Sequence, residues 1–296
     1  MCVSLIVKGD AVSVFLNEVA VTAFDEQVKQ SYQGDSKLHM CVTTRNNVTG
    51  DEYRFQQIGK GMAHERTAPS SDSIPMNITY TKTLVQLIDW DADEYTDLFM
   101  RKEVNFDEVR ELASVIKKAL GRRIDQTIID AVNDARASLV SIGNIVLEGS
   151  TGLDLAKLTA TAQLMDELEI DEEDRFFVGT TKAKQQLLNT TEATSSDYAT
   201  VKALVNGQIN TFMGFTFKWI GKREEGGMYI NTDIADCFAF HRASIGSAYG
   251  IEPNTTVDWV PQKKSHLSAG QMKMGSIVRD LEGVFIVETD QTVIPA

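Results

Sequence analysis

The sequence contains few of the residues that disulfide frameworks and structural metal sites require. Only three cysteines occur, Cys2, Cys41 and Cys237, and they lie far apart with no Cys-x-x-Cys pair. Closely spaced cysteine pairs are the signature of both kinds of site, so neither is indicated. We expect reduced, partly buried thiols and no metal or other cofactor.

Long hydrophobic runs and basic charge are scarce as well. No apolar stretch reaches the ~18 residues that a membrane span needs, and residues 1–8 have neither the basic start nor the cleavage site of a signal peptide. There are 29 Lys and Arg against 42 Asp and Glu, a net charge of -13. Because nucleic-acid binding draws on clustered Lys and Arg, this balance argues against a dedicated nucleic-acid binder. We expect a chain that is cytosolic when made, with no membrane partner.

Catalytic motifs are incomplete wherever they begin. The four histidines are isolated, and His64 lacks the second histidine of a zinc protease. The segment around Ser247 misses the nucleophile-elbow spacing by one position, and Gly59-Lys60-Gly61 is too short for a phosphate loop. The acidic runs 89–94 and 171–174 lack the Gly and distal Glu of a calcium loop, which favours solvated turns. We predict no catalytic, cofactor-binding or metal-binding residue and no enzyme activity.

Two strand patterns flank a loop rich in turn residues. Residues 51–58 and 76–85 alternate apolar and polar side chains, with Gly, Pro and Ser between the two runs. A two-stranded hairpin has no core of its own and is marginal in water, so its apolar face must be covered elsewhere. We expect six of its side chains to contact neighbouring subunits: Tyr53, Phe55, Ile58, Met76, Ile78 and Tyr80.

The clearest local pattern is a long amphipathic helix over residues 106–138. Its apolar residues recur at three- and four-residue steps, and Asn105 with Glu108 fits a capping box at its start. Gly121 interrupts the pattern and indicates that another segment packs closely there. At 1.5 Å per residue the helix would be about 50 Å long, a spine crossing a flat domain.

The other patterns mix helices and strands without regular alternation, which is typical of an α+β fold. Residues 1–40 contain no self-sufficient core unit, and we expect them to form an arm. Further helices are expected at 155–168, 182–188 and near 198–205, and strands at 175–179, 212–220, 236–241, 255–260, 272–278 and 284–288.

Several segments, taken in order, match those of a known family. They are 91–97, 112–125, 175–179 with Gln186-Leu187-Leu188, 206–209 with 212–215, 237–246, and 275–287 as a closing hairpin. The set resembles the major capsid proteins of tailed bacteriophages with the Hong Kong 97 fold. The resemblance implies an N-terminal arm (1–40), an extended loop (41–90), a peripheral domain with the spine helix (91–145 and 250–296) and an axial domain (146–249).

The resemblance also implies a function and a set of partners. The subunit would self-assemble as hexamers and pentamers into the icosahedral shell of a virion, enclosing double-stranded DNA that it contacts non-specifically at most. A portal is an expected partner, and a decoration protein an optional one. Since some relatives begin with a long helical scaffold segment and this sequence shows none, we expect a separate scaffolding protein and assembly in the host cytoplasm.

Two alternative functions and one question about cross-linking stay open at this point. An encapsulin-like bacterial nanocompartment would share the fold, and a soluble α+β hydrolase would share the composition. Some relatives also join their subunits by a Lys–Asn isopeptide bond. The resemblance places Lys60 at the tip of the extended loop, which makes it the candidate lysine, although an ordinary solvated lysine is the simpler interpretation.

Overall fold

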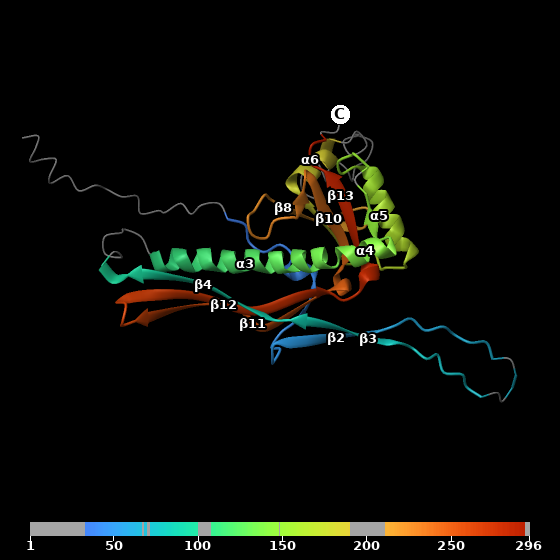
Figure 1. Ribbon diagram of the computed structural model, residues 1–296, viewed down its shortest axis with the longest axis horizontal. Coiled ribbons are helices and arrows are strands. Elements are labelled where there is room, and N and C mark those ends of the chain that lie inside the picture. The colour runs from blue at the N-terminus through green and yellow to red at the C-terminus, as the bar shows by residue number, and fades with distance from the viewer. Residues whose placement is uncertain are drawn as a thin grey trace, which may run out of the picture.

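The described helix with the most residues in the computed structural model is α3 (Glu108–Asp134), which lies along the strands labelled β4 and β12 in Figure 1. The structure describes residues 33–66, 68–69, 72–99, 108–147, 149–189 and 211–293. Helix α4 (Arg136–Ile142) follows α3 and ends at Gly143, whose φ of 85° is the left-handed conformation that glycine adopts without strain. The predicted spine helix is therefore confirmed as two consecutive helices, whereas its predicted cap, Asn105, lies outside the described residues.

A four-stranded sheet lies beneath α3. Its order is β1-β11-β12-β4, and its strands are β1 (Thr43–Arg45), β11 (Ile245–Val260), β12 (Ser265–Val278) and β4 (Ile88–Asp97). One face packs on α3, because Met272 and Met274 of β12 join Ile116 and Leu120 of the helix in one buried cluster. Helix and sheet together form the peripheral unit.

The predicted hairpin is present as a separate two-stranded sheet of β2 (Glu52–Ile58) and β3 (Tyr80–Gln86). Residues 59–66 and 72–79, which continue from the two strands, project away from α3 and its sheet (Figure 1). The second strand begins at Tyr80 instead of Met76, because beyond the Ile58–Tyr80 pair only one further backbone bond forms, from Gly59 N to Thr79 O at 2.8 Å.

A second unit, the axial unit, stands above the end of α3 (Figure 1). Its seven-stranded sheet has the order β5-β13-β10-β6-β8-β7, with β9 paired to β10. The strands are β5 (Ile145–Val146), β13 (Val284–Asp290), β10 (Ile234–His241), β6 (Arg175–Thr180), β8 (Phe215–Ile220), β7 (Thr211–Phe212) and β9 (Ile230–Asn231). Helices α5 (Leu155–Glu167) and α6 (Thr181–Asn189) complete it, as predicted apart from their ends.

Strand β13 departs from the expected domain division. We expected residues 275–287 to form a closing hairpin and 250–296 to belong wholly to the peripheral domain. Strands β12 and β13 do not pair; β13 lies between β5 and β10 in the axial sheet. The reason is burial on both faces: Val284 and Ile286 enter one core, and Phe285 and Val287 enter the other. A strand that is apolar on both sides is stable only in the middle of a covered sheet.

Gly121 gives a first test of the packing around α3. A side chain there would meet Asp35 Oδ1 at 2.9 Å and the backbone nitrogen of Ser36 at 3.0 Å. Alanine normally stabilises a helix relative to glycine by about 1 kcal/mol. Here we expect Gly121→Ala to destabilise the subunit by roughly 1–3 kcal/mol, because residues 35–36 must move away. Thermal unfolding, with the exposed Lys117→Ala as control, measures it; an unchanged or higher Tm contradicts close packing.

Candidate assembly surfaces

The base of the extended loop is fastened to its own subunit by an aromatic side chain. Phe55 is only 4% exposed and packs with Val85, Leu87 and Ala248. The guanidinium of Arg279 lies 4.9 Å from the centre of the Phe55 ring, a cation–π contact. Because these residues come from β2, β3, β11 and the turn after β12, the cluster fixes the angle at which the loop leaves the body.

Ion pairs add to this anchorage at the surface. Lys273 Nζ of β12 lies 2.6 Å from Asp51 and 3.5 Å from Asp89, and Lys60 Nζ lies 2.6 Å from Glu282. The hydrogen bond to Asp51 raises the pKa of Lys273, and that to Glu282 raises the pKa of Lys60. All these groups are solvated, so each pair contributes little to stability by itself.

The opposite face of the hairpin carries apolar side chains with no cover. Ile58 and Tyr80 form a cross-strand pair and are 65% and 73% exposed. Alternation along β2 and β3 places them on the face that points away from Phe55 and Val85. Four more exposed apolar side chains belong to the same loop: Met62, Ile74, Met76 and Leu84. Single exposed apolar residues are ordinary, but six on one projecting segment mark an interaction surface.

The structure divides the six residues expected to contact neighbours. The expectation that Phe55 contacts a neighbour is corrected, because its ring is buried in its own subunit and offers a partner almost no surface. Tyr53 packs edge-on against it at 4.8 Å between ring centres and is half-buried. Ile58, Met76 and Tyr80 are exposed and Ile78 is half-buried. The sequence alone could have indicated this division. Tyr53 and Phe55 have odd numbers and Ile58 an even one, so alternation along β2 places Ile58 on the face opposite the other two.

Lys60 also lies elsewhere than expected. It is two residues beyond the end of β2, near the base of the loop and not at its tip, and it pairs with Glu282 of the same subunit. The side chain is therefore not at the loop tip, but it is solvated, as the simpler interpretation held, since 77% of it is exposed. Whether mature particles carry an isopeptide bond stays a prediction to be tested by denaturing gel, where a ladder of bands supports the bond.

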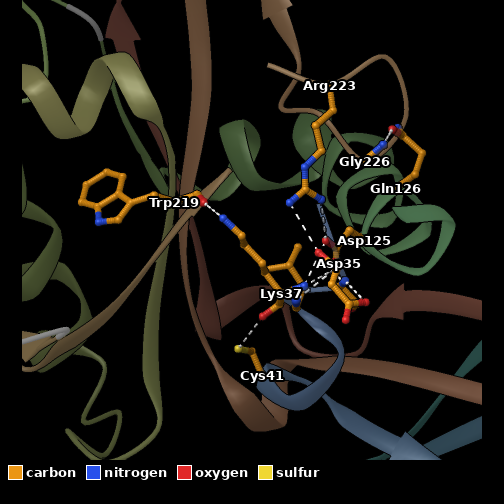
Figure 2. Close-up of polar contacts among 10 residues, drawn as sticks. Asp35, Lys37, Cys41, Asp125, Gln126, Trp219, Arg223 and Gly226 are labelled. Carbon is orange, nitrogen blue, oxygen red and sulfur yellow. Dashed lines mark hydrogen bonds and ion pairs between the residues drawn. The ribbon is translucent and has the colours of Figure 1, made fainter. Parts of the chain in front are cut away.

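A buried carboxylate joins the arm, the spine helix and the axial unit. Asp125 of α3 is fully buried (Figure 2). It accepts hydrogen bonds from Ser36 Oγ at 2.9 Å and from the backbone nitrogens of Lys37 and Leu38 at 3.0 Å each. Arg223, in the segment after β8, pairs with it at 3.2 Å. Leu38 is itself fully buried against α3, so residues 35–38 are held in one direction.

The segment after β8 is positioned by the same helix. The backbone nitrogen of Gly226 donates to Gln126 Oε1 at 2.8 Å, and Gly226 has a φ of +74°. A side chain there would meet the carbonyl oxygen of Arg122 at 2.7 Å, so both the conformation and the space require glycine. The motif search did not find this joint. The available signal was the spacing of Gly121 and Asp125, which places a small residue and an acid one turn apart on the same face.

The remaining expectations concern metals, thiols and membranes. Over the described ranges, no group of three His, Cys, Asp or Glu side chains is arranged to hold a metal ion. Cys41 and Cys237 are buried, and burial raises the pKa of both thiols; Cys2 lies outside the described residues. Within the same ranges, no helix is both long enough and apolar enough to cross a membrane.

Comparison with known proteins agrees with this architecture. A family model described as phage capsid protein matches residues 16–291, and the chain belongs to that family. The capsid of cyanophage P-SCSP1u has a TM-score of 0.72 at 15% identity, covering 92% of this chain and 93% of that chain. The head structure of the Helicobacter pylori bacteriophage KHP40 has a TM-score of 0.73 at 9% identity, covering 97% and 100%. No curated protein matches the sequence.

Family and fold together define the role of the chain. It has the Hong Kong 97-type fold, which the capsid of Ralstonia phage GP4 shares at a TM-score of 0.69 and 10% identity over 98% of both chains. It is a major capsid protein, a structural component of the virion that associates with copies of itself to form the head shell. Enclosure of the packaged DNA is implied. The family thus favours the phage shell over the nanocompartment and the hydrolase.

Removing the Asp125 carboxylate tests the joint. Asp125→Ala leaves the guanidinium of Arg223 and two backbone N–H groups buried without an acceptor. We expect the free energy of unfolding to fall by about 3–5 kcal/mol. The exposed Asp130→Ala, on the same helix, should change it by less than about 0.5 kcal/mol. Urea unfolding of both variants measures the difference, and equal effects would contradict a special role of Asp125.

Proposed function

We propose that the extended loop clamps a neighbouring copy of the subunit in the shell. The observation that carries the proposal is the exposed pair Ile58 and Tyr80, on a hairpin whose other face is already anchored by Phe55. A folded base gives the loop a defined direction, and the apolar outer face needs cover that the described part of its own chain does not provide. A second copy of the chain supplies that cover.

The energy of one clamp is modest, and the number of clamps makes it sufficient. Burying an exposed Ile or Tyr side chain contributes about 1.5–3 kcal/mol, part of which offsets the ordering of the loop. Several such contacts per subunit, repeated round a closed shell, sum to a stable particle. The role is mechanical, and we propose no reaction for this chain.

The proposal assigns a part to each segment. Residues 41–90 reach to the neighbour, with Ile58, Met76, Ile78 and Tyr80 as the contacting side chains. The peripheral unit, 91–145 with β11 and β12, carries the spine, and the axial unit, now including β13, faces the five- and six-fold centres. Residues 1–40 leave the body from the Asp125 joint as an arm.

The partners that we propose beyond the chain itself are those that membership of the phage capsid family leads us to expect. A separate scaffolding protein that sets the curvature, a portal at one vertex and an optional decoration protein complete the proposal. Assembly takes place in the host cytoplasm. The net charge of -13 supports DNA contacts that are non-specific at most.

Tyr80→Asp tests the clamp. A charge at this position must lose its hydration when the loop is covered, so we expect folded subunits that form at least about tenfold fewer closed particles. Tyr80→Phe keeps the ring and should assemble normally. Sedimentation and electron microscopy count the particles, and circular dichroism checks the fold. Normal assembly of the Tyr80→Asp variant would contradict the clamp proposal.

Two further variants separate anchorage from contact. Thr81→Asp places the same charge on the neighbouring residue of β3, whose side chain alternates to the other face, and should have the smaller effect. Phe55→Asp should instead lower the Tm of the free subunit, because its ring is buried before assembly. A stable Phe55→Asp subunit would contradict the anchorage of the loop.

The mass of the assembled subunit tests the separate scaffold. If the scaffold is a different protein, the subunit in mature particles keeps a mass close to the 32.8 kDa of the full sequence. Intact-mass spectrometry of purified particles measures it. A much smaller mass would show that part of this chain is cut away and serves as its own scaffold.

A further inference from the structure

Rings of identical subunits place a demand on the axial unit. A closed ring needs a head-to-tail interface, in which two different surfaces of the same chain fit each other. The axial unit has two sides that can serve, one formed by α5 and the other by β8, and they lie at opposite edges of its sheet (Figure 1). The charges on these two sides are of opposite sign.

The side at the end of α5 is acidic. Residues 166–174 include seven acidic residues and no basic one. Three cations near this segment are already engaged. The buried Arg175 pairs with Asp166 at 2.8 Å and Arg242 pairs with Asp174 at 3.0 Å. Lys60, which Glu169 also influences, pairs with Glu282. Five of the acids are exposed and have no ion pair among the described residues: Glu167, Glu169, Asp171, Glu172 and Glu173. We call these five residues the acidic flank.

The side at β8 is basic. Lys37 reaches β8 from the arm and donates to the carbonyl oxygen of Trp219 at 2.6 Å, next to Lys218 (Figure 2). Lys184 of α6 lies close enough to act on the same ammonium: burial and Arg223 lower the pKa of Lys37, and Lys184 and Lys218 lower it further, against the opposing effect of Asp125. Neither Lys184 nor Lys218 has an ion pair within the described ranges. We call Lys37, Lys184 and Lys218 the basic flank.

A surplus of cations at one place is unusual in a chain with a net charge of -13. Like charges held together cost free energy unless an opposite charge covers them. The closest acids of the segment after β8 do little to compensate, because Asp125 is taken by Arg223 and Glu225 pairs with Arg123 at 2.6 Å. Within the described part of the chain, no acid forms an ion pair with Lys37, Lys184 or Lys218, so an acidic surface of another copy can neutralise them.

We propose that the acidic flank of one copy contacts the basic flank of the next copy around each ring of the shell. The occupant of each surface is a second copy of this chain, and the two surfaces differ, as a head-to-tail interface requires. Opposite charges at a rim steer the two copies together and set their register, and like charges exclude the reversed approach. This contact rests on the self-association of the family and is independent of the extended loop.

Charge reversal on both sides tests the contact in the full-length chain. Glu167→Lys with Glu169→Lys reverses the acidic flank, and Lys184→Glu with Lys218→Glu reverses the basic one. Each double variant sets like charges against each other, and we expect closed particles to fall by at least about tenfold. The quadruple variant restores opposite charges and should recover to within about twofold of the unchanged chain. Glu167→Lys and Glu169→Lys combined with Lys117→Glu and Lys264→Glu, which add two acids at exposed positions outside both flanks and outside the extended loop, should not recover.

Each outcome decides the matter. Recovery in the quadruple variant alone supports the proposal, together with weaker ring formation at 1 M salt, where the Debye length is only about 3 Å. Normal assembly of either double variant overturns it, and so does a quadruple variant that folds but does not recover. If charge reversal lowers the Tm of a subunit, Gln substitutions at the same four positions are used instead. If particles of the unchanged chain are then as insensitive to salt as particles of the Gln variants, the proposal is overturned. Failure of the loop-clamp proposal would instead be seen as normal assembly of Tyr80→Asp, so the failures of the two proposals are distinguishable.

Discussion

The buried carboxylate of Asp125 is the contact on which the arrangement of the subunit depends. An ionised group out of water is stable only when donors surround it. The spine helix supplies the carboxylate, and its donors come from two other parts of the chain, residues Ser36 to Leu38 and Arg223 beyond β8. Each part is thereby held relative to the other two. Residues 36–38 and the segment after β8 are thus tied to α3 at one point, beside the apolar core that packs the axial sheet on the same helix.

The subunit combines firm anchorage with weak exposed contacts. Phe55 and Arg279 hold the base of the extended loop, whereas Ile58 and Tyr80 on its outer face await cover. The charged flanks of the axial unit are solvated in the same way. Contacts that are individually worth a few kcal/mol can break and form again, so a misplaced copy can leave before a shell closes. Strength in the particle comes from repetition, and accuracy comes from the rigidity of each subunit's own joints.

Much of the fold was predictable because its signals are local. The periodicity of α3, the alternation of β2 and the apolar run of β6 each depend on neighbouring residues, and all three were confirmed. Long-range choices were not predictable. The place of β13 in the axial sheet depends on which partner strand covers both of its faces, and the burial of Phe55 depends on β11 and Arg279. The Asp125 joint was missed for the same reason, since its donors lie about ninety residues away in the sequence.

The position of β13 has a consequence for the timing of folding. This strand lies in the interior of the axial sheet, between β5 and β10, yet it is made of residues 284–290. A polypeptide still emerging from the ribosome has β5 and β10 available before β13, the strand that lies between them, has been made. Completion of the axial sheet therefore waits for almost the whole of this sequence to be synthesised. A chain that stops before residue 284 lacks an interior strand of the axial sheet, and we expect it not to form the axial surfaces that a ring would use.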